Sequence, residues 1–352
     1  MRHGSSIDPP NRFERLHLER EPGEPAGNDE DGHGLPRREL EYIEDQAQSI
    51  VASNDSPDLP FRYSLNPYRG CVHACAYCYA RPTHEYLGFN AGLDFETRIV
   101  VKKQAARLFE VFLRKPGWKA EPISFSGVTD CYQPVERDLR LTRGCLEVAR
   151  RFRQPVSIIT KNALILRDLD LLASIARENL VHVYLSLTTL RPDLAAMMEP
   201  RTSIPEARLR AIRELSAASV PTGAMVAPVI PGLNDSEIPQ ILQAVSQAGA
   251  TTAGYVLIRL PSTVRPVFEE WLQRTHPAEA DKVLDRIRQT RQGKSSDSTF
   301  GQRLTGTGEL ADQIGNLFQV FRRQYGLDEK LPPHDRSRFR PPPDHSDQRL
   351  LF

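Results

Sequence analysis

The sequence has no long apolar segment, no leader pattern and no internal repeat. Its uninterrupted apolar runs are short, as in Ala163-Leu-Ile-Leu166, whereas a membrane-spanning helix needs about 20 apolar residues. The N-terminus begins Met1-Arg2-His3-Gly4 and soon becomes acidic, so it lacks the apolar core of a secretory signal. No unit recurs at a fixed period of roughly 20–50 residues. We therefore expect a cytoplasmic protein that has no membrane partner.

The overall charge is also small, but it is unevenly distributed. The 352 residues include 46 Lys and Arg against 45 Asp and Glu. Residues 1–60 carry 6 basic and 14 acidic side chains, and residues 98–167 carry 15 basic and 6 acidic ones. An acidic head and a basic middle are compatible with an anionic or nucleic-acid substrate. The alternative is charge spread over solvated helix faces.

The remaining composition is that of a globular protein. The chain is 39% hydrophobic and 26% charged, which excludes wholesale disorder, a collagen-like repeat and a coiled coil. The first 40 residues are rich in Pro, Gly and charged residues and predict a disordered acidic arm. Residues 331–352, with Pro332-Pro333 and Pro341-Pro342-Pro343, predict a disordered tail. Between these arms, residues 41–292 form the predicted main domain, and residues 293–330 form a Gly/Ser-rich loop and a last helix.

Short apolar segments alternate with helical patterns along the main domain. Segments with strand character lie near 61–65, 121–126, 155–160, 181–188, 222–230 and 253–260. Helical patterns follow at 102–114, 140–153, 166–178, 204–219, 236–248 and 262–291, with a further one at 310–326. This alternation predicts an α/β fold with a parallel sheet. Six units are compatible with a doubly wound sheet or with an incomplete barrel, and in both the site lies at the carboxyl ends of the strands.

Three of the five cysteines lie in one stretch, Gly70-Cys71-Val72-His73-Ala74-Cys75-Ala76-Tyr77-Cys78-Tyr79. A disulfide would leave one thiol over and does not suit the expected compartment. Three thiolates in one loop favour an iron–sulfur cluster, or zinc with His73 or His84 as fourth ligand. Three ligands instead of four suggest an open coordination position and a metal that takes part in chemistry.

The C-x3-C-x2-C spacing, with Tyr77 before the third cysteine, resembles the motif of the radical S-adenosylmethionine (SAM) superfamily. The flanking Asn66-Pro67-Tyr68-Arg69-Gly70 and Tyr79-Ala80-Arg81 resemble the branch that includes spore photoproduct lyase and DNA repair photolyase-like proteins. The resemblance implies a 4Fe–4S cluster on Cys71, Cys75 and Cys78, with one iron left for SAM. It also implies a partial (β/α)6 TIM-like barrel over residues 41–292, which favours the barrel over the doubly wound sheet.

The same resemblance assigns cofactor-binding positions at later strand ends. Ser126, Gly127 and Asp130 stand where the superfamily has a Gly–Gly–Glu-like stretch that binds the methionine amino group; this sequence departs from that pattern, and a helix-capping Asp130 is the alternative. The other predicted cofactor-binding residues are Lys161, Ser186, Thr188, Arg201, Val229 and Ile230. Lys161 and Arg201 are candidates for the SAM carboxylate, with solvent exposure and a pair with Glu199 as their respective alternatives. Ser186 and Thr188 share one strand face, so their hydroxyls either hold the cofactor ribose or carboxylate or satisfy buried neighbours. Val229 and Ile230 resemble the adenine-lining stretch.

Other positions carry weaker signals. Cys131 is a candidate hydrogen-atom donor or second metal ligand, and a small packing residue is the alternative. Arg259 ends the sixth strand segment and is a candidate for facing the substrate. The Gly/Ser/Thr-rich stretch 293–310 predicts either a lid over the open side of the barrel or a plain linker.

The predicted activity is that of a radical SAM enzyme with lyase-like character. In such an enzyme an electron from a donor such as flavodoxin or ferredoxin cleaves SAM, and a 5′-deoxyadenosyl radical removes a hydrogen atom from the substrate. The basic middle and the branch resemblance favour a nucleic acid or nucleotide as substrate. The alternatives are radical SAM modification of a protein, peptide or small metabolite, and a non-catalytic metal-binding module.

Overall fold

The main element of the structure, a computed structural model that describes residues 3–14, 39–341 and 343, is a seven-stranded sheet. Its strand order is β10-β9-β8-β7-β6-β3-β2. The neighbours from β3 to β10 are all parallel, and β2 is antiparallel to β3 at one edge. The strands are β2 (Val51–Ser53), β3 (Tyr63–Leu65), β6 (Ile123–Phe125), β7 (Val156–Thr160), β8 (Val181–Ser186), β9 (Thr222–Val229) and β10 (Thr252–Leu257).

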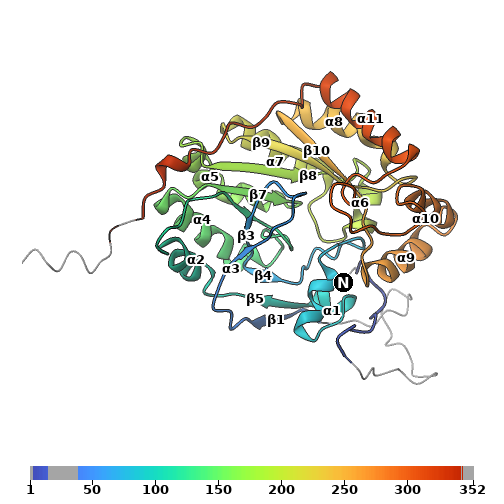
Figure 1. The fold of residues 1–352 in the computed structure, drawn as a ribbon, viewed down its shortest axis with the longest axis horizontal. Coiled ribbons are helices and arrows are strands. Elements are labelled where there is room, and N and C mark those ends of the chain that lie inside the picture. Colours follow the sequence, from blue (N-terminus) through green and yellow to red (C-terminus); the bar gives the residue numbers. More distant parts are fainter. Residues whose placement is uncertain (1–2, 15–38, 342, 344–352) are drawn as a thin grey trace, which may run out of the picture.

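The six parallel strands coincide with the six strand segments predicted from the sequence. From β3 to β10 their spatial order follows the chain without reversal, whereas a doubly wound sheet reverses at a switch point. The helices lie outside the sheet (Figure 1). The partial (β/α)6 barrel is therefore confirmed, and its two edges are β10 and β2.

The predicted helices are present with small shifts at their ends. They are α2 (Ala105–Leu113), α4 (Leu141–Phe152), α5 (Leu169–Ala176), α7 (Pro205–Ala217), α8 (Ile238–Gln247) and α11 (Glu309–Gln324). The pattern at 262–291 is two helices, α9 (Val264–Thr275) and α10 (Ala280–Gln289). Pro277 lies in the break, and its ring and missing N–H are incompatible with a helix interior.

Several short elements were not predicted. A second sheet has the order β1-β5-β4 and lies below the barrel in Figure 1. Its strands are β1 (Glu41–Glu44), β4 (Tyr68–Arg69) and β5 (Arg98–Val101), and the short helices are α1 (Leu93–Thr97), α3 (Glu136–Leu139) and α6 (Pro192–Met198). These elements are too short for periodicity to separate them from loops.

The apolar core has two main parts. The larger one fills the space between the sheet and the outer helices, with fully buried Phe125, Phe152 and Leu185 among its members. The smaller one contains Cys75 and Tyr77 and packs them against α6, α9 and α10. The cysteine loop is therefore part of a packed core at the carboxyl side of the barrel.

Residues 3–14, which fall within the predicted disordered arm, pack against the body of the protein. Ser5 and Asn11 are buried, and the backbone N–H of Ser5 donates to Glu96 Oε1 at 2.8 Å. Asn11 Nδ2 donates to the carbonyl of Glu85 at 2.9 Å. This segment of the predicted arm therefore supplies hydrogen-bond donors to buried polar groups. Residues 15–38 lie outside the described part of the chain.

The predicted tail is likewise packed over 331–341. His334 Nε2 lies 3.1 Å from the Val156 carbonyl, the Arg340 N–H donates to the Phe152 carbonyl at 3.0 Å, and Phe339 packs against the main core. These contacts cover the amino ends of β7 and β8, opposite the cysteines. The sequence did not reveal them because proline-rich composition predicts an extended chain and not its docking site. The rest of the predicted tail, 342 and 344–352, lies outside the described residues.

The segment 293–308 bridges the two edges of the barrel. The Leu257 N–H of β10 donates to the Leu304 carbonyl at 2.9 Å. The Gly301 N–H donates to Asp58 Oδ1 at 2.7 Å, and Arg303 forms an ion pair with the same carboxylate. Asp58 lies between β2 and β3, so this bridging segment spans the open side. In the described residues, no helix has the length and apolar character needed to cross a membrane.

Candidate functional site

The cysteine loop connects β4 to a short 3-10 turn at Arg81–Thr83. Cys71 and Cys75 are buried, Cys78 is half-buried, and all three are free thiols. The loop is curled by two tight turns, in which the N–H of Ala74 donates to Cys71 O and the N–H of Cys78 donates to Cys75 O, both at 3.2 Å. Ala74 adopts a left-handed backbone conformation (φ 57°). The sequence spacing therefore brings three thiols onto one short loop, as predicted.

The thiols influence one another electrostatically. Burial, followed by the neighbouring Cys78, raises the pKa of Cys71. Burial and Glu199 raise the pKa of Cys75, with smaller effects from Cys78 and Cys71. Since thiolates are the metal-binding form, this loop must lose protons when it binds a metal. Three soft donors without a disulfide, two of them buried, fit an iron–sulfur cluster.

The two histidines considered as a fourth zinc ligand have other neighbours. Within residues 3–14 and 39–341, no group of three or more His, Cys, Asp or Glu side chains is arranged to hold a metal ion. His73 is directed to Asp130 and Asn162, and His84 is enclosed by Phe89 and Phe95. A structural zinc needs four donors at about 2.0–2.3 Å from one ion. A four-iron cluster is a larger object held at separate corners, so its ligands need not meet at one point.

Arg81 supports the cysteine loop by hydrogen bonds to its backbone. Its side chain is fully buried, donates twice to the Cys75 carbonyl (2.8 and 3.2 Å) and forms an ion pair with Glu96. Glu96 also accepts from the N–H groups of Gly4 and Ser5 and lies 3.3 Å from Arg201 Nη2. Burial opposes ionisation of Glu96, but Arg81, His3 and Arg201 lower its pKa. One buried carboxylate thus joins the N-terminal segment to the loop.

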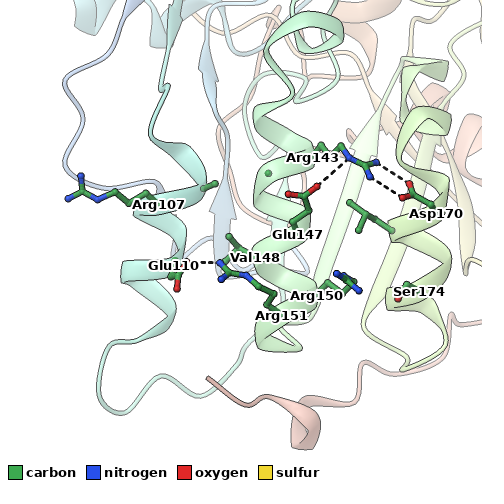
Figure 2. Close-up of a pocket in the computed structure, with 12 residues that line it drawn as sticks. Arg107, Glu110, Arg143, Glu147, Val148, Arg150, Arg151, Asp170 and Ser174 are labelled. Atoms are coloured by element: carbon green, nitrogen blue, oxygen red, sulfur yellow. Dashed lines mark hydrogen bonds and ion pairs between the residues drawn. The ribbon is translucent and has the colours of Figure 1, made fainter. Parts of the chain in front are cut away.

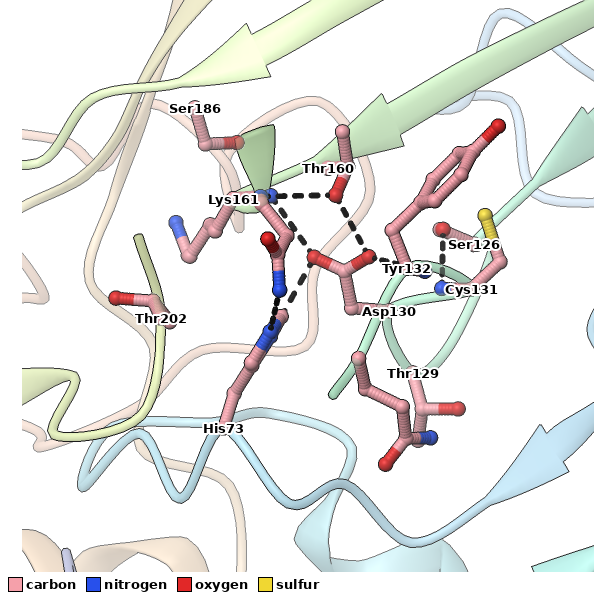
Figure 3. A network of polar contacts seen from close by, with 12 residues as sticks. His73, Ser126, Thr129, Asp130, Cys131, Tyr132, Thr160, Lys161, Ser186 and Thr202 are labelled. Atoms are coloured by element: carbon pink, nitrogen blue, oxygen red, sulfur yellow. Dashed lines mark hydrogen bonds and ion pairs between the residues drawn. The ribbon is translucent and has the colours of Figure 1, made fainter. Parts of the chain in front are cut away.

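Asp130 forms a second polar centre, at the carboxyl ends of β6 and β7 (Figure 3). Its Oδ1 accepts from Thr160 Oγ1 (2.8 Å) and the Tyr132 N–H (2.9 Å). Its Oδ2 accepts from the Lys161 N–H (2.8 Å) and lies 3.5 Å from His73 Nδ1. A carboxylate has about four acceptor positions, so protein donors fill those of Asp130. This placement suits a residue that organises the turn after β6 better than an acceptor for a ligand ammonium group.

His73 in this centre is neutral. Burial lowers its pKa to about 4, although Asp130 acts in the opposite direction. Its Nε2 lies 3.1 Å from the amide nitrogen of Asn162, so Nε2 is the acceptor and Nδ1–H faces Asp130. This connection fixes the cysteine loop to the ends of β6 and β7.

Ser126 and Gly127 lie directly after β6, as predicted. Ser126 has φ 70°, and its hydroxyl accepts from the Cys131 N–H at 2.8 Å. A Cβ on Gly127 would lie 2.6 Å from Cβ of Ser64, so only glycine fits against this neighbouring strand. The Gly127 carbonyl accepts from the exposed Tyr79 hydroxyl at 3.2 Å.

Glu199 is a functional-site residue that sequence reasoning did not single out. Its buried carboxylate accepts from Tyr77 and Thr188 and forms an ion pair with Arg208, which is also buried. Lys161 Nζ lies 3.5 Å from Glu199 Oε1 and donates to the Ala227 carbonyl at 2.9 Å. Burial raises the pKa of Glu199, but Arg208 and Lys161 outweigh burial and lower it below its usual range. The available signal was Arg208, a polar residue beside apolar positions of the helical pattern at 204–219.

The remaining predicted cofactor residues are placed as follows. The alternative for Arg201 was an ion pair with Glu199. In the structure its guanidinium instead pairs with Glu96. Ser186 and Thr188 are both buried, and the Thr188 hydroxyl is used by Glu199. Val229 packs in the core under the outer helices, whereas Ile230 packs in the cluster that contains Cys75 and Tyr77.

Cys131 lies away from the cysteine loop's thiols. It is fully buried in the main core, and burial followed by Asp130 raises the pKa of its thiol. Its environment suits the packing alternative.

Four arginines of the basic middle lie on the outer helices α2 and α4. A groove of about 660 Å³ between α2, α4 and α5 is lined by Arg107, Arg143, Arg150 and Arg151 (Figure 2). Arg143 pairs with Asp168 and Asp170, and Arg151 pairs with Glu110. Much of the positive charge is therefore neutralised locally on a solvated helix face, remote from the cysteines.

Relatives and solved structures agree with this architecture. The radical SAM superfamily profile matches residues 65–245. An uncharacterised protein of Mycobacterium tuberculosis is 43% identical over 221 residues, which are 62% of this chain and 65% of the relative. One of Methanocaldococcus jannaschii is 31% identical over 198 residues, 56% of this chain and 71% of the relative. The chain thus spans about two thirds of the mycobacterial relative's length.

Among solved structures, spore photoproduct lyase complexed with dinucleoside spore photoproduct has a TM-score of 0.59 at 15% identity, covering 81% of this chain and 79% of that one. A double mutant of that lyase, with bound AdoMet and dinucleoside spore photoproduct, has a TM-score of 0.57 at 17% identity and the same coverage. At this level of identity the likeness concerns the fold. Because the family profile covers more than half of the chain and the barrel matches, the chain belongs to the radical SAM superfamily.

Proposed function

We propose that this protein binds a 4Fe–4S cluster through Cys71, Cys75 and Cys78 and uses it with SAM in radical catalysis. The observation that carries the proposal is the placement of three free thiols on one curled loop at the carboxyl edge of a six-stranded partial barrel. When bound, the reduced cluster and SAM supply a 5′-deoxyadenosyl radical that removes a hydrogen atom from the substrate. The electron comes from an external donor such as flavodoxin or ferredoxin.

The protein's own residues bind and orient these groups. Arg201 acts electrostatically on both Cys71 and Cys75, so its charge offsets that of a thiolate-bound cluster. Lys161 donates to the Ala227 carbonyl and lies 3.5 Å from Glu199 Oε1. An ammonium has three donors, so a further one can serve the SAM carboxylate. Ser186 ends β8 and Gly127 follows β6, so both lie at the carboxyl edge of the barrel. Ile230 supplies an apolar surface for adenine.

Other candidates are left out of cofactor contact in this proposal. The acceptor positions of Asp130 and the hydroxyl of Thr188 are occupied by protein partners. The side chain of Val229 faces the main core, and Cys131 serves in packing.

For the substrate we propose a nucleic acid or nucleotide, modified in a lyase-like reaction. Support comes from the fold shared with a lyase that was solved with a dinucleoside photoproduct. The basic middle gives less support than the sequence suggested, because its ion pairs on the outer helices neutralise much of its charge.

The test is anaerobic reconstitution with iron and sulfide, followed by metal analysis and a 5′-deoxyadenosine assay with dithionite and SAM. We expect about four irons per chain and 5′-deoxyadenosine formation. Both should be lost in a Cys71/Cys75/Cys78→Ala variant and kept in Cys145→Ala, which removes a buried thiol on α4. Stoichiometric zinc without SAM cleavage would refute the proposal in favour of a non-catalytic metal-binding module.

A further inference from the structure

Arg259 stands just beyond the carboxyl end of β10, at the edge of the barrel covered by the bridging segment 293–308. Its Nε is buried without a hydrogen-bond partner, and within the described residues the guanidinium forms no ion pair. The titratable groups near enough to act on it are Arg303, Tyr79, Asp58 and Asp297. It is thus enclosed between the cysteine loop, the β2–β3 connection and the bridging segment.

The two nearby carboxylates are engaged elsewhere. Asp58 accepts from the Gly301 N–H and pairs with Arg303. Asp297 accepts from the Thr299 N–H at 2.8 Å. Both carboxylates therefore have donors of their own.

A third guanidinium raises the positive charge of this region further. Arg291 donates to four carbonyls, among them those of Leu257 and Ile258, and its charge interacts with those of Arg259 and Asp297. Three guanidinium groups thus face two carboxylates. Leaving a partly buried cation unpaired costs free energy, and an anionic ligand would remove that cost.

The surroundings of Arg259 also include exposed aromatic rings. Tyr79 is 54% exposed, and its hydroxyl is fixed to the Gly127 carbonyl at the end of β6. Phe300 is 55% exposed, with Arg303 stacked 4.6 Å from the ring centroid. A cation combined with exposed rings is the combination that binds phosphates and stacks bases of single-stranded nucleic acids.

We propose that Arg259 binds a phosphate of a nucleotide or single-stranded nucleic acid, and that Tyr79 stacks on an adjacent base. The substrate then lies at the edge of the barrel that the bridging segment covers, beside Arg259 and Tyr79. This inference rests on the proposed function, since it names the anchor of the same substrate class.

The test is equilibrium binding of a fluorescein-labelled ten-residue oligodeoxythymidylate to the reconstituted protein, measured by anisotropy across a salt series. Arg259→Gln should weaken binding by about tenfold or more and reduce the slope of log affinity against log salt by about 1. Arg259→Lys should recover part of the loss, and Tyr79→Leu should weaken binding regardless of base sequence. The matched control is Arg265→Gln, an exposed arginine of α9 that pairs with Glu269; it should change affinity by less than about twofold.

Equal affinity for wild type and Arg259→Gln, at equal thermal stability, would overturn the proposal. So would absence of oligonucleotide binding by the wild type, or preferential binding of an acidic peptide of the same charge. The same preparations are also assayed for 5′-deoxyadenosine without oligonucleotide, which distinguishes the proposed function from the proposed phosphate anchor. Absence of 5′-deoxyadenosine refutes radical SAM chemistry, whereas SAM cleavage without Arg259-dependent binding refutes only the anchor.

Discussion

Replacing Arg208 with methionine should destabilise the protein strongly through Glu199. The two side chains are among the most buried charged groups, at 1% and 2% exposure, and Arg208 also donates to the carbonyls of Ser186 (3.0 Å) and Ser203 (2.7 Å). Removing one partner of a buried ion pair costs about 3–5 kcal/mol, because the other charge stays buried with less compensation; for Glu199 that leaves Lys161 and two hydroxyl donors. With roughly 2 °C per kcal/mol for a chain of this size, the melting temperature should fall by about 6–10 °C.

The pH dependence has a defined sign. In the wild type the pKa of Glu199 is lowered, with burial opposed by Arg208 and Lys161, so its contribution to stability is present above the ordinary carboxyl pKa and is lost as the pH falls. In Arg208→Met burial is opposed mainly by Lys161, so the pKa of Glu199 rises relative to the wild type, and the difference in stability should shrink towards acid pH.

The assay is thermal unfolding of the two proteins between about pH 5 and pH 8, with Arg210→Met as control. Arg210 is on the same helix, but it is exposed and pairs with Glu214, so its loss should cost less than about 0.5 kcal/mol. A second variant, Glu199→Gln in the Arg208→Met background, should recover part of the loss, because a neutral amide is cheaper to bury than a carboxylate. A melting temperature of Arg208→Met that matches Arg210→Met would refute the reasoning.

Three further predictions concern the termini and the core. Burial and His182 lower the pKa of His334 to about 4, so its stabilising contribution is complete above the ordinary value of 6.5 and is lost as the pH falls from 6.5 to 4. Over this range the free energy of unfolding should fall by roughly 2 kcal/mol more in the wild type than in His334→Gln. Parallel curves of stability against pH would contradict this. A Cβ on Gly4 would lie 1.9 Å from the Ala74 carbonyl oxygen, so Gly4→Val should displace the N-terminal segment and increase hydrogen exchange in the cysteine loop, whereas unchanged exchange would argue against a supporting role. Cys131→Ala should cost about 1–2 kcal/mol in chemical denaturation and leave 5′-deoxyadenosine formation intact; loss of that activity at unchanged iron content would restore Cys131 as a catalytic candidate.

Part of the candidate site could be predicted because its residues are local in sequence. Cys71, Cys75 and Cys78 lie within eight residues, so chain connectivity alone keeps their thiols on one loop. The strand-end positions of Ser126 and Lys161 followed from alternation of strands and helices, since parallel βαβ units bring all carboxyl ends to one edge. The same rules fixed neither the partners of these side chains nor their protonation.

The partners depended on contacts between residues far apart in the chain. Glu199 and Tyr77 are separated by 122 positions, and Glu96 joins Gly4, Arg81 and Arg201 from three different segments. Periodicity reports which face of an element is buried, but it does not identify the element that covers that face. The sequence therefore suggested Asp130 as a ligand and Glu199 as a partner for Arg201, and the structure gave them other partners.

The sequence by itself determined the order of strands and helices and the loop that carries the three cysteines, because each depends on local periodicity and short-range connectivity. The choice of a barrel over a doubly wound sheet came from the family resemblance, since six units fit both folds. Only the tertiary structure decided which charges neutralise one another, which terminal segments pack on the body, and that Arg259 has no ion pair among the described residues. Those outcomes depend on burial and on distances across the fold, where a few ångströms change the electrostatic energy of a pair severalfold.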